Sequence, residues 1–129
     1  MLARYRIHRG KRPPDDPLPE GVRQDTRRHT KRPLRPSRDM GEEYLAEPTE
    51  SAWRRFEQEY LALLEERFAS DRGPFDHLAD LARKQDVFLG CSCPTKKNPR
   101  VDHCRTYPAL HFMMRKYPDL DVRLPLLPH

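Results

Sequence analysis

The sequence is poor in the residues that build a large protein core. Its mean hydropathy is -1.00, and hydrophobic residues make up 36% of the chain. It contains no apolar run long enough to span a bilayer and no signal peptide, so we expect a cytoplasmic protein with no membrane partner. Its three cysteines are an odd number, which argues against a disulfide framework and favours a reducing compartment.

Most of the large apolar side chains lie in residues 49–129, whereas residues 8–43 hold few. We therefore expect residues 1–10 to give an N-terminal strand, residues 11–48 a basic proline-rich arm or loop, and residues 49–129 the main α/β body. A unit of roughly 80 to 90 residues buries only about 60–65% of its unfolded surface. We therefore expect a modest free energy of unfolding, unless a partner or a second copy of the chain, as in a homo-oligomer, stabilises the fold.

Positive charge is concentrated in the first 40 residues, which contain 12 Lys and Arg against 5 Asp and Glu. Such a segment on a near-neutral body predicts an anionic partner: nucleic acid, a nucleotide or an acidic protein surface. Aromatic residues, which provide stacking platforms for single strands, are absent from the basic run. The alternative is a solvated segment whose arginines pair with acidic helix residues. The candidate ligand-binding residues of this segment are Arg23, Arg27, Arg28, His29 and Lys31.

Periodicity predicts the regular elements of the body. Residues 2–8 alternate as a half-buried edge strand. One stripe of a long helix, which Thr49 or Ser51 caps, is formed by Trp53, Phe56, Tyr60, Leu63, Leu64 and Phe68. A shorter helix ends near residue 84. Within residues 86–91 a continuous apolar run follows Asp86, as expected of a buried parallel strand. A third helix begins near 105–107, and a strand covers 121–124. The order β-α-α-β-α-β predicts a small layered α/β domain with a short, mostly parallel sheet.

The segment "GCSCPTKKNPRVDHCRT", residues 90–106, contains all three cysteines and lies between the buried strand and the third helix. Ligand sites of open parallel sheets lie at the carboxyl ends of the strands, so this loop is the predicted site. Gly90 there allows a close backbone approach or a positive φ. Cations and a helix N-terminus favour the thiolate of Cys104, with Cys93 as its partner thiol. The candidate anion-binding residues of the loop are Lys96, Lys97, Arg100, Arg105 and the helix-capping Thr106.

Two other interpretations of the cysteines remain open. A structural zinc site could use Cys91, Cys93, His103 and Cys104, although the C-x-C pair and the adjacent His-Cys pair are tighter than the usual spacings of zinc ligands. Alternatively the thiols fill small spaces in the core, because free cysteine is among the most buried residue types. We expect this of Cys91, which continues the apolar run of its strand.

The stretch "DVFLGCSCP", the loop after it and the cysteine that opens the next helix resemble the YeaO-like family of small bacterial proteins of unknown function. The resemblance includes the "WRRFEQEYLALLE" helix and covers residues of about 50–125. In that family a Cys-His-Arg or Cys-His-Thr segment opens the helix. Here the order is His103, Cys104, Arg105, so only Cys104 corresponds cleanly. The resemblance implies an α/β fold and brings no established activity.

The sequence therefore predicts binding of a phosphate-bearing ligand, nucleotide or nucleic acid, at the loop 90–106 together with the basic segment. A small enzyme or redox protein that uses Cys104, with or without Cys93, is the alternative, and the zinc site is the second. The sequence indicates no cofactor.

Overall fold

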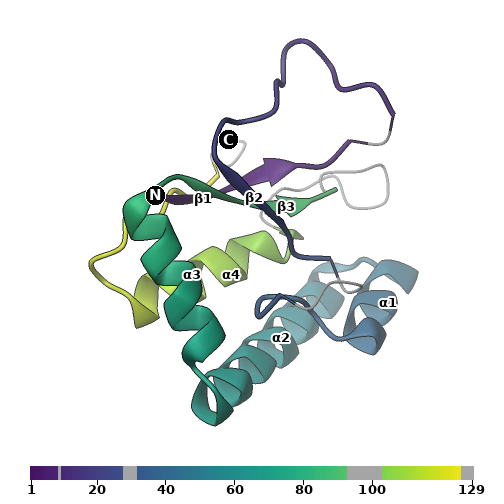
Figure 1. The fold of residues 1–129 in the computed structure, drawn as a ribbon. Coiled ribbons are helices and arrows are strands. Elements are labelled where there is room, and N and C mark those ends of the chain that lie inside the picture. The colour runs from purple at the N-terminus through teal and green to yellow at the C-terminus, as the bar shows by residue number, and fades with distance from the viewer. Residues whose placement is uncertain (9, 28–31, 93–102, 126–129) are drawn as a thin grey trace.

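Seven regular elements make up the part of the chain that the structure describes. The structure is a computed structural model, and it describes residues 1–8, 10–27, 32–92 and 103–125. Its elements, shown in Figure 1, are β1 (Leu2–Arg6), β2 (Val22–Asp25), α1 (Arg38–Ala46), α2 (Glu50–Ser70), α3 (Gly73–Lys84), β3 (Val87–Cys91) and α4 (Thr106–Lys116). The predicted class, a small α/β domain with a short parallel sheet, is confirmed.

The sheet has the order β1-β3-β2, and both pairs are parallel. In the centre of the sheet, β3 buries Val87, Leu89 and Cys91 completely, which is why its sequence is continuously apolar. β1 forms one edge of this sheet, as the sequence predicted. A single parallel bridge joins Leu2 to Val122 beyond that edge.

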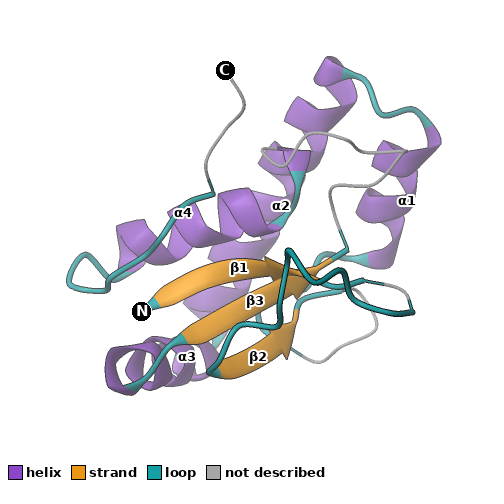
Figure 2. Cartoon of the chain, turned by 90° about the horizontal axis from the view of Figure 1, so that it is seen from above, coloured by secondary structure: helices purple, strands orange, loops and turns teal. Residues whose placement is uncertain are grey.

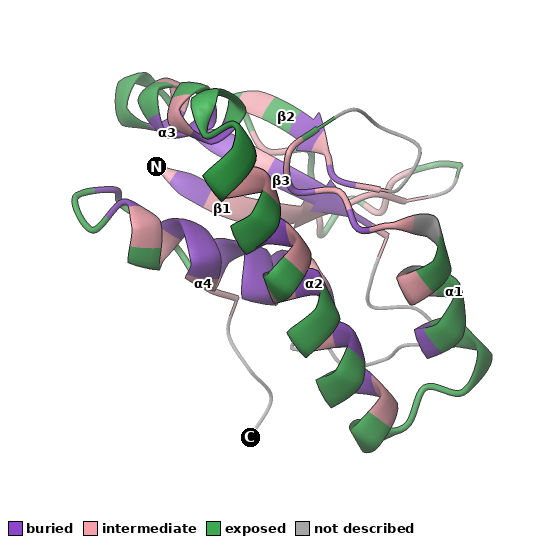
Figure 3. Cartoon of the chain, turned by 90° about the horizontal axis from the view of Figure 1, so that it is seen from below, coloured by how far each residue is buried: buried purple, intermediate pink, exposed green. Residues whose placement is uncertain are grey.

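The helices α2, α3 and α4 lie on one face of the sheet, while the described part of the segment between β1 and β2 crosses the other face (Figures 1 and 2). Four residues of the stripe predicted for α2 are buried, and Leu63 and Phe68 are partly buried. The exposed residues lie on the outer side of the helix (Figure 3). The helix begins where the Thr49 side chain accepts a hydrogen bond from the Ala52 amide, at 3.1 Å. In the described part of the chain, no helix combines the length and the apolar content that a membrane crossing needs.

The predicted element order was incomplete. The segment 11–48 contains the strand β2 and the nine-residue helix α1, neither of which the sequence analysis predicted. Conversely, the strand expected at 121–124 is reduced to the bridge at Val122. The expected cap of the last helix was also wrong. Thr106 is the first residue of α4, Arg105 occupies the cap position, and no side chain caps this end.

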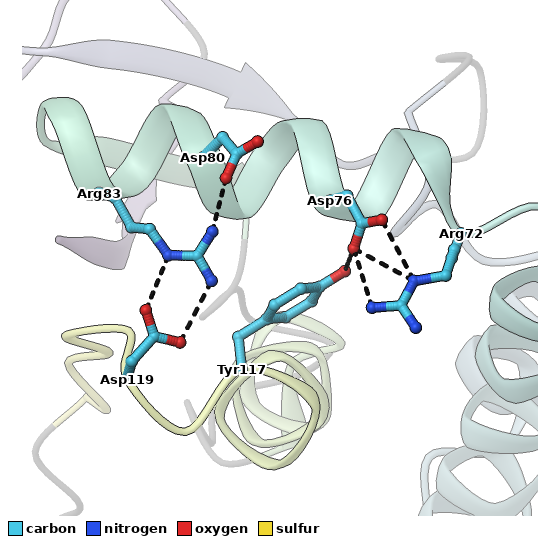
Figure 4. A network of polar contacts seen from close by, with 6 residues as sticks. All are labelled: Arg72, Asp76, Asp80, Arg83, Tyr117 and Asp119. Carbon is cyan, nitrogen blue, oxygen red and sulfur yellow. Dashed lines mark hydrogen bonds and ion pairs between the residues drawn. The ribbon is translucent and has the colours of Figure 1, made fainter.

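A surface network joins α3 to the C-terminal end of α4, and Figure 4 shows its six residues: Arg72, Asp76, Asp80, Arg83, Tyr117 and Asp119. The Tyr117 hydroxyl donates to Asp76 at 2.5 Å, and Arg83 donates to Asp119 at 2.8 Å. Hydrogen bonds from Arg72 and then Tyr117 hold the pKa of Asp76 below its usual value. Burial and the bond to Asp76 raise the pKa of Tyr117. The network fixes one end of α4 while its other end meets the sheet.

Candidate functional site

The carboxyl ends of all three strands lie at one edge of the sheet, which we call the carboxyl edge. The backbone amide and the hydroxyl of Thr26 both donate to the Gly90 carbonyl, at 3.0 and 2.9 Å. On the other side of β3, the Ile7 amide donates to the Cys91 carbonyl at 2.9 Å. These contacts extend the strand pairing beyond β1 and β2, so the chain leaves the sheet from three adjacent points.

Gly90 allows a close approach at this edge, which was one of the two roles predicted for it. The described glycines with positive φ are Gly10 and Gly21, so the other role does not apply. A Cβ atom on Gly90 would lie 2.7 Å from Tyr5 Cε1 and 2.9 Å from Ile7 Cδ1. The space at Gly90 is therefore filled by side chains of β1 and of the residue that follows it.

A chain of three polar groups connects β1 to the start of α4. The Arg4 Nε–H donates to Thr106 Oγ1 at 3.1 Å, and the Thr106 hydroxyl donates to Cys104 Sγ, also at 3.1 Å. Thr106 is fully buried and Cys104 is 1% exposed. A hydroxyl donor with a guanidinium behind it stabilises a sulfur that carries negative charge, whereas burial disfavours that charge. The arrangement supplies the sulfur with a donor that the sequence did not predict.

The other proposed thiols differ in position. Cys91 is completely buried at the end of β3, as its place in the apolar run predicted. Cys93 lies outside the described residues.

His103, the other proposed zinc ligand, stacks on Trp53, with ring centroids 5.0 Å apart, and its Nε2 lies 3.1 Å from a carboxylate oxygen of Glu50. Within the described ranges, no group of three or more His, Cys, Asp or Glu residues could hold a metal ion.

The loop after β3 and the basic segment after β2 meet at the carboxyl edge. Arg105, at the cap position of α4, donates from Nε to the Thr26 carbonyl at 3.1 Å. Arg27 follows directly, and its guanidinium pairs with Asp25 at 2.7 Å. That hydrogen bond raises the pKa of Arg27. Arg23 is exposed and donates to the Pro19 carbonyl at 2.9 Å. The remaining predicted ligand-binding residues lie outside the described part: Arg28, His29, Lys31, Lys96, Lys97 and Arg100.

The basic segment is attached to the helical layer beyond these residues. Leu34 is 1% exposed and belongs to the core, and its carbonyl accepts a hydrogen bond from the Tyr60 hydroxyl at 2.5 Å. Burial raises the pKa of Tyr60, so the hydroxyl stays protonated and remains a donor. Arg67 donates to the carbonyls of Pro33 and Arg35, at 3.0 and 2.5 Å. The segment is thus anchored to α2 through its backbone.

Residues of β1 and of the segment after it were missing from the predicted site. Arg4 reaches Thr106, and His8 Nε2 lies 2.7 Å from an oxygen of Asp16, at the carboxyl edge. Arg6, the last residue of β1, has a buried Nε. The alternation of Arg4, Arg6 and His8 on one face was visible in the sequence. Only the parallel pairing of β1 with β3 brings that face to the cysteine loop.

A shallow cleft of about 170 Å³ lies between α1 and α2, apart from the predicted site residues. Three of its ten lining side chains are aromatic or large and apolar, and three are glutamates. The residues that line it are Met40, Glu43, Tyr44, Glu47, Thr49, Ser51, Ala52, Arg55, Phe56 and Glu59. Three glutamates against Arg55 give its lining a net negative charge, which disfavours an anionic ligand.

Comparison with known proteins found no matching family model, no matching curated protein and no matching solved structure. The case for a function therefore depends on the carboxyl edge itself.

Proposed function

We propose that the protein binds a phosphate-bearing ligand, a nucleotide or a nucleic acid, at the carboxyl edge. The observation that carries the proposal is the hydrogen bond from Arg105 to the Thr26 carbonyl. It joins the loop after β3 to the beginning of the basic segment. Two cationic regions that are about 80 positions apart in the sequence therefore meet at the sheet edge where parallel α/β proteins bind their ligands.

The chemistry of this edge supports an anion. Guanidinium groups recognise phosphate oxygens through paired N–H donors. The Arg105 Nε donates to a neutral carbonyl rather than to a carboxylate, so this contact does not neutralise its positive charge. Arg27 contributes less, because Asp25 neutralises it. The first turn of α4 adds little to this, because Pro108 has no N–H and the Tyr107 amide already donates to the Cys104 carbonyl.

Replacing Arg105 by glutamine is expected to weaken binding of a labelled oligonucleotide or a nucleotide by roughly 10-fold or more, the effect of losing one charged hydrogen bond. Fluorescence anisotropy at low salt measures the oligonucleotide, and calorimetry measures the nucleotide. Arg123→Gln is the matched control. It removes the same charge beside Val122, which bridges to the first residue of β1 at the opposite end of the sheet.

The two ligand classes differ in their response to salt. Binding of a nucleic acid should weaken steeply between 50 and 200 mM salt, because several counterions are released from the phosphate backbone. A single nucleotide should show a shallow dependence. Equal losses in the Arg105 and Arg123 variants, or no binding of either ligand at low salt, would contradict the proposal.

A second candidate function is a cysteine-dependent enzyme or redox protein, and the hydrogen bond from Thr106 to Cys104 favours it. Because Arg4 donates to the same hydroxyl, the sulfur has a polarised donor in place before any ligand arrives. The polarised donor suits a nucleophilic or redox-active thiol, whereas the 1% exposure of Cys104 is that of a core cysteine, so a substrate would have to reach a buried sulfur.

The thiol hypothesis predicts that alkylation of Cys104 by iodoacetamide has a midpoint below pH 8.5, roughly the value of a free thiol. In Thr106→Val, which keeps the shape and removes the donor, the midpoint should rise. Mass spectrometry follows Cys104 and, in the same sample, Cys91, a buried cysteine that serves as the internal control. Equal, slow modification of both thiols with no effect of Thr106→Val would eliminate this function.

A further inference from the structure

Arg6 contains a buried donor that has no hydrogen-bond acceptor within the described ranges. It is the last residue of β1, lies opposite Cys91 in the parallel ladder, and is partly buried as a whole. Among the buried side-chain nitrogen and oxygen atoms of the described residues, the Arg6 Nε is the one that has no hydrogen-bond partner. Native proteins pair nearly all such groups with protein, water or a bound ion. The donor therefore needs an acceptor that the described residues do not provide.

The nearby carboxylate does not supply this acceptor. A hydrogen bond from His8 is the main cause that holds the pKa of Asp16 below its usual value, and the positive charge of Arg6 is the smallest cause. One oxygen of Asp16 lies 2.7 Å from His8 Nε2, and the other lies 3.4 Å from Arg12. Among the described residues, Arg6 forms no ion pair with Asp16 or any other carboxylate. It contributes to the field at Asp16 and keeps its own Nε–H unbonded.

Two arginines of β1 lie on one side of the strand. Arg4 and Arg6 are two residues apart, so their side chains leave the same face with an offset of about 7 Å along the strand. Arg4 reaches Thr106 at the start of α4, which sets the direction of this face. Tyr5 lies on the other face, where it packs against Gly90. Arg6 therefore belongs to the side of β1 from which Arg4 reaches α4, one step nearer the carboxyl edge.

We infer that Arg6 marks the position of a single terminal phosphate group, a phosphomonoester, at the carboxyl edge. This inference rests on the proposed function and makes it more specific. A terminal phosphate has three free oxygens and a charge of about -1.5 to -2 near neutral pH, and it can accept from Nε and a terminal nitrogen of one guanidinium together. It binds as the end of a ligand rather than as part of a continuous strand.

Access to Arg6 favours the end of a ligand over the middle of a polymer. The segment that follows β1 folds back over it: Arg12 donates from Nη1 to the Arg6 carbonyl at 2.7 Å and from Nε to the Asp16 carbonyl at 2.6 Å. The Nε of Arg6 is itself buried. An internal phosphodiester has substituents on two of its oxygens, so it cannot present three free oxygens to a recessed donor. A monoester is therefore the better fit.

The direct test is the Nε–Hε signal of Arg6 in a ¹H-¹⁵N NMR spectrum of the full chain, titrated with inorganic phosphate and then with a nucleoside 5′-monophosphate. Both probes should shift this signal. The matching nucleoside 3′,5′-cyclic phosphate, a diester, should bind at least 10-fold more weakly. Arg6→Gln should weaken monophosphate binding at least 10-fold, whereas Arg123→Gln should leave it unchanged. The signal is assigned by its disappearance in Arg6→Lys, a variant that keeps the charge.

The outcomes separate this inference from the proposed function. If the monophosphate binds, Arg105→Gln weakens it and Arg6→Gln does not, the inference is wrong and the proposed function stands. If no phosphate compound binds, both are wrong. An Arg6 Hε signal that exchanges slowly with solvent and ignores phosphate would assign a buried water to this donor and overturn the inference. Because the Hε titration uses the unmodified chain, it tests whether phosphate binds at Arg6 even where Arg6→Gln fails to fold.

Discussion

Replacing Leu34 by alanine is expected to lower the free energy of unfolding by about 2–5 kcal/mol, the usual cost of truncating a fully buried leucine. Leu34 is 1% exposed and packs in the hydrophobic core, although it lies among arginines and prolines in the basic segment. A domain of this size is stable by about 5–15 kcal/mol in all. The loss would therefore be a large share of the total and would show that the segment is part of the fold.

Leu18→Ala is the matched control, because the same side chain is 52% exposed there and the expected change is within about 0.5 kcal/mol. Urea denaturation followed by circular dichroism measures both variants. Equal, small changes in the two midpoints would mean that Leu34 does not anchor the basic segment in the core. A fall in nucleotide affinity that accompanies the loss at Leu34 is expected, because this anchor follows the basic run.

The composition of the basic segment explains why the sequence predicted an arm there. One buried leucine gives no periodicity, and the groups that hold it, Tyr60 and Arg67, are 26 to 34 positions away in the sequence. Their acceptors are backbone carbonyls, which any residue could supply. Such contacts have no local signature, so a proline-rich stretch that is anchored cannot be distinguished from one that is not.

The elements that the sequence predicted well are those whose own side chains record their burial. The apolar run of β3 indicates that both faces of this strand are covered, and the stripe of α2 indicates which face of the helix packs on the core. β2 has one apolar residue, Val22, and forms because β3 offers it a backbone to pair with. The expected strand at 121–124 had the right pattern, but it meets only the first residue of β1.

The strand-to-helix position of Cys104 and Arg105 was predicted, whereas two arginines of the candidate site were not. Strand-to-helix order alone placed the loop 90–106 at the carboxyl edge, and Cys104 and Arg105 are found there. Arg4 and Arg6 were missed because an arginine on an edge strand ordinarily faces solvent. Parallel pairing with β3 brings Arg4 to the start of α4 instead. The sequence of a strand shows which of its side chains share a face, but it does not show which strand pairs with it.

Replacing Gly21 by alanine is expected to cost about 3 kcal/mol or more and to lower the melting temperature by about 10 °C or more. Gly21 has φ of +137°, which an alanine adopts only under strain, and its Cβ atom would lie 2.6 Å from the backbone oxygen of Asp86. That same oxygen accepts the hydrogen bond from the Val22 amide that begins the pairing of β2 with β3. Relieving the collision therefore moves β2 away from β3.

Gly10→Ala separates the two causes, because Gly10 also has positive φ, +69°, and nothing lies within 4 Å of its Cβ position. Its expected cost is the conformational strain alone, about 1–2 kcal/mol. Differential scanning calorimetry compares the two variants, and equal costs would mean that the contact with Asp86 does not matter. Since β2 leads directly into Thr26 and the Arg105 contact, Gly21→Ala should also weaken nucleotide binding. Gly10→Ala should not, because it leaves the pairing of β2 with β3 in place.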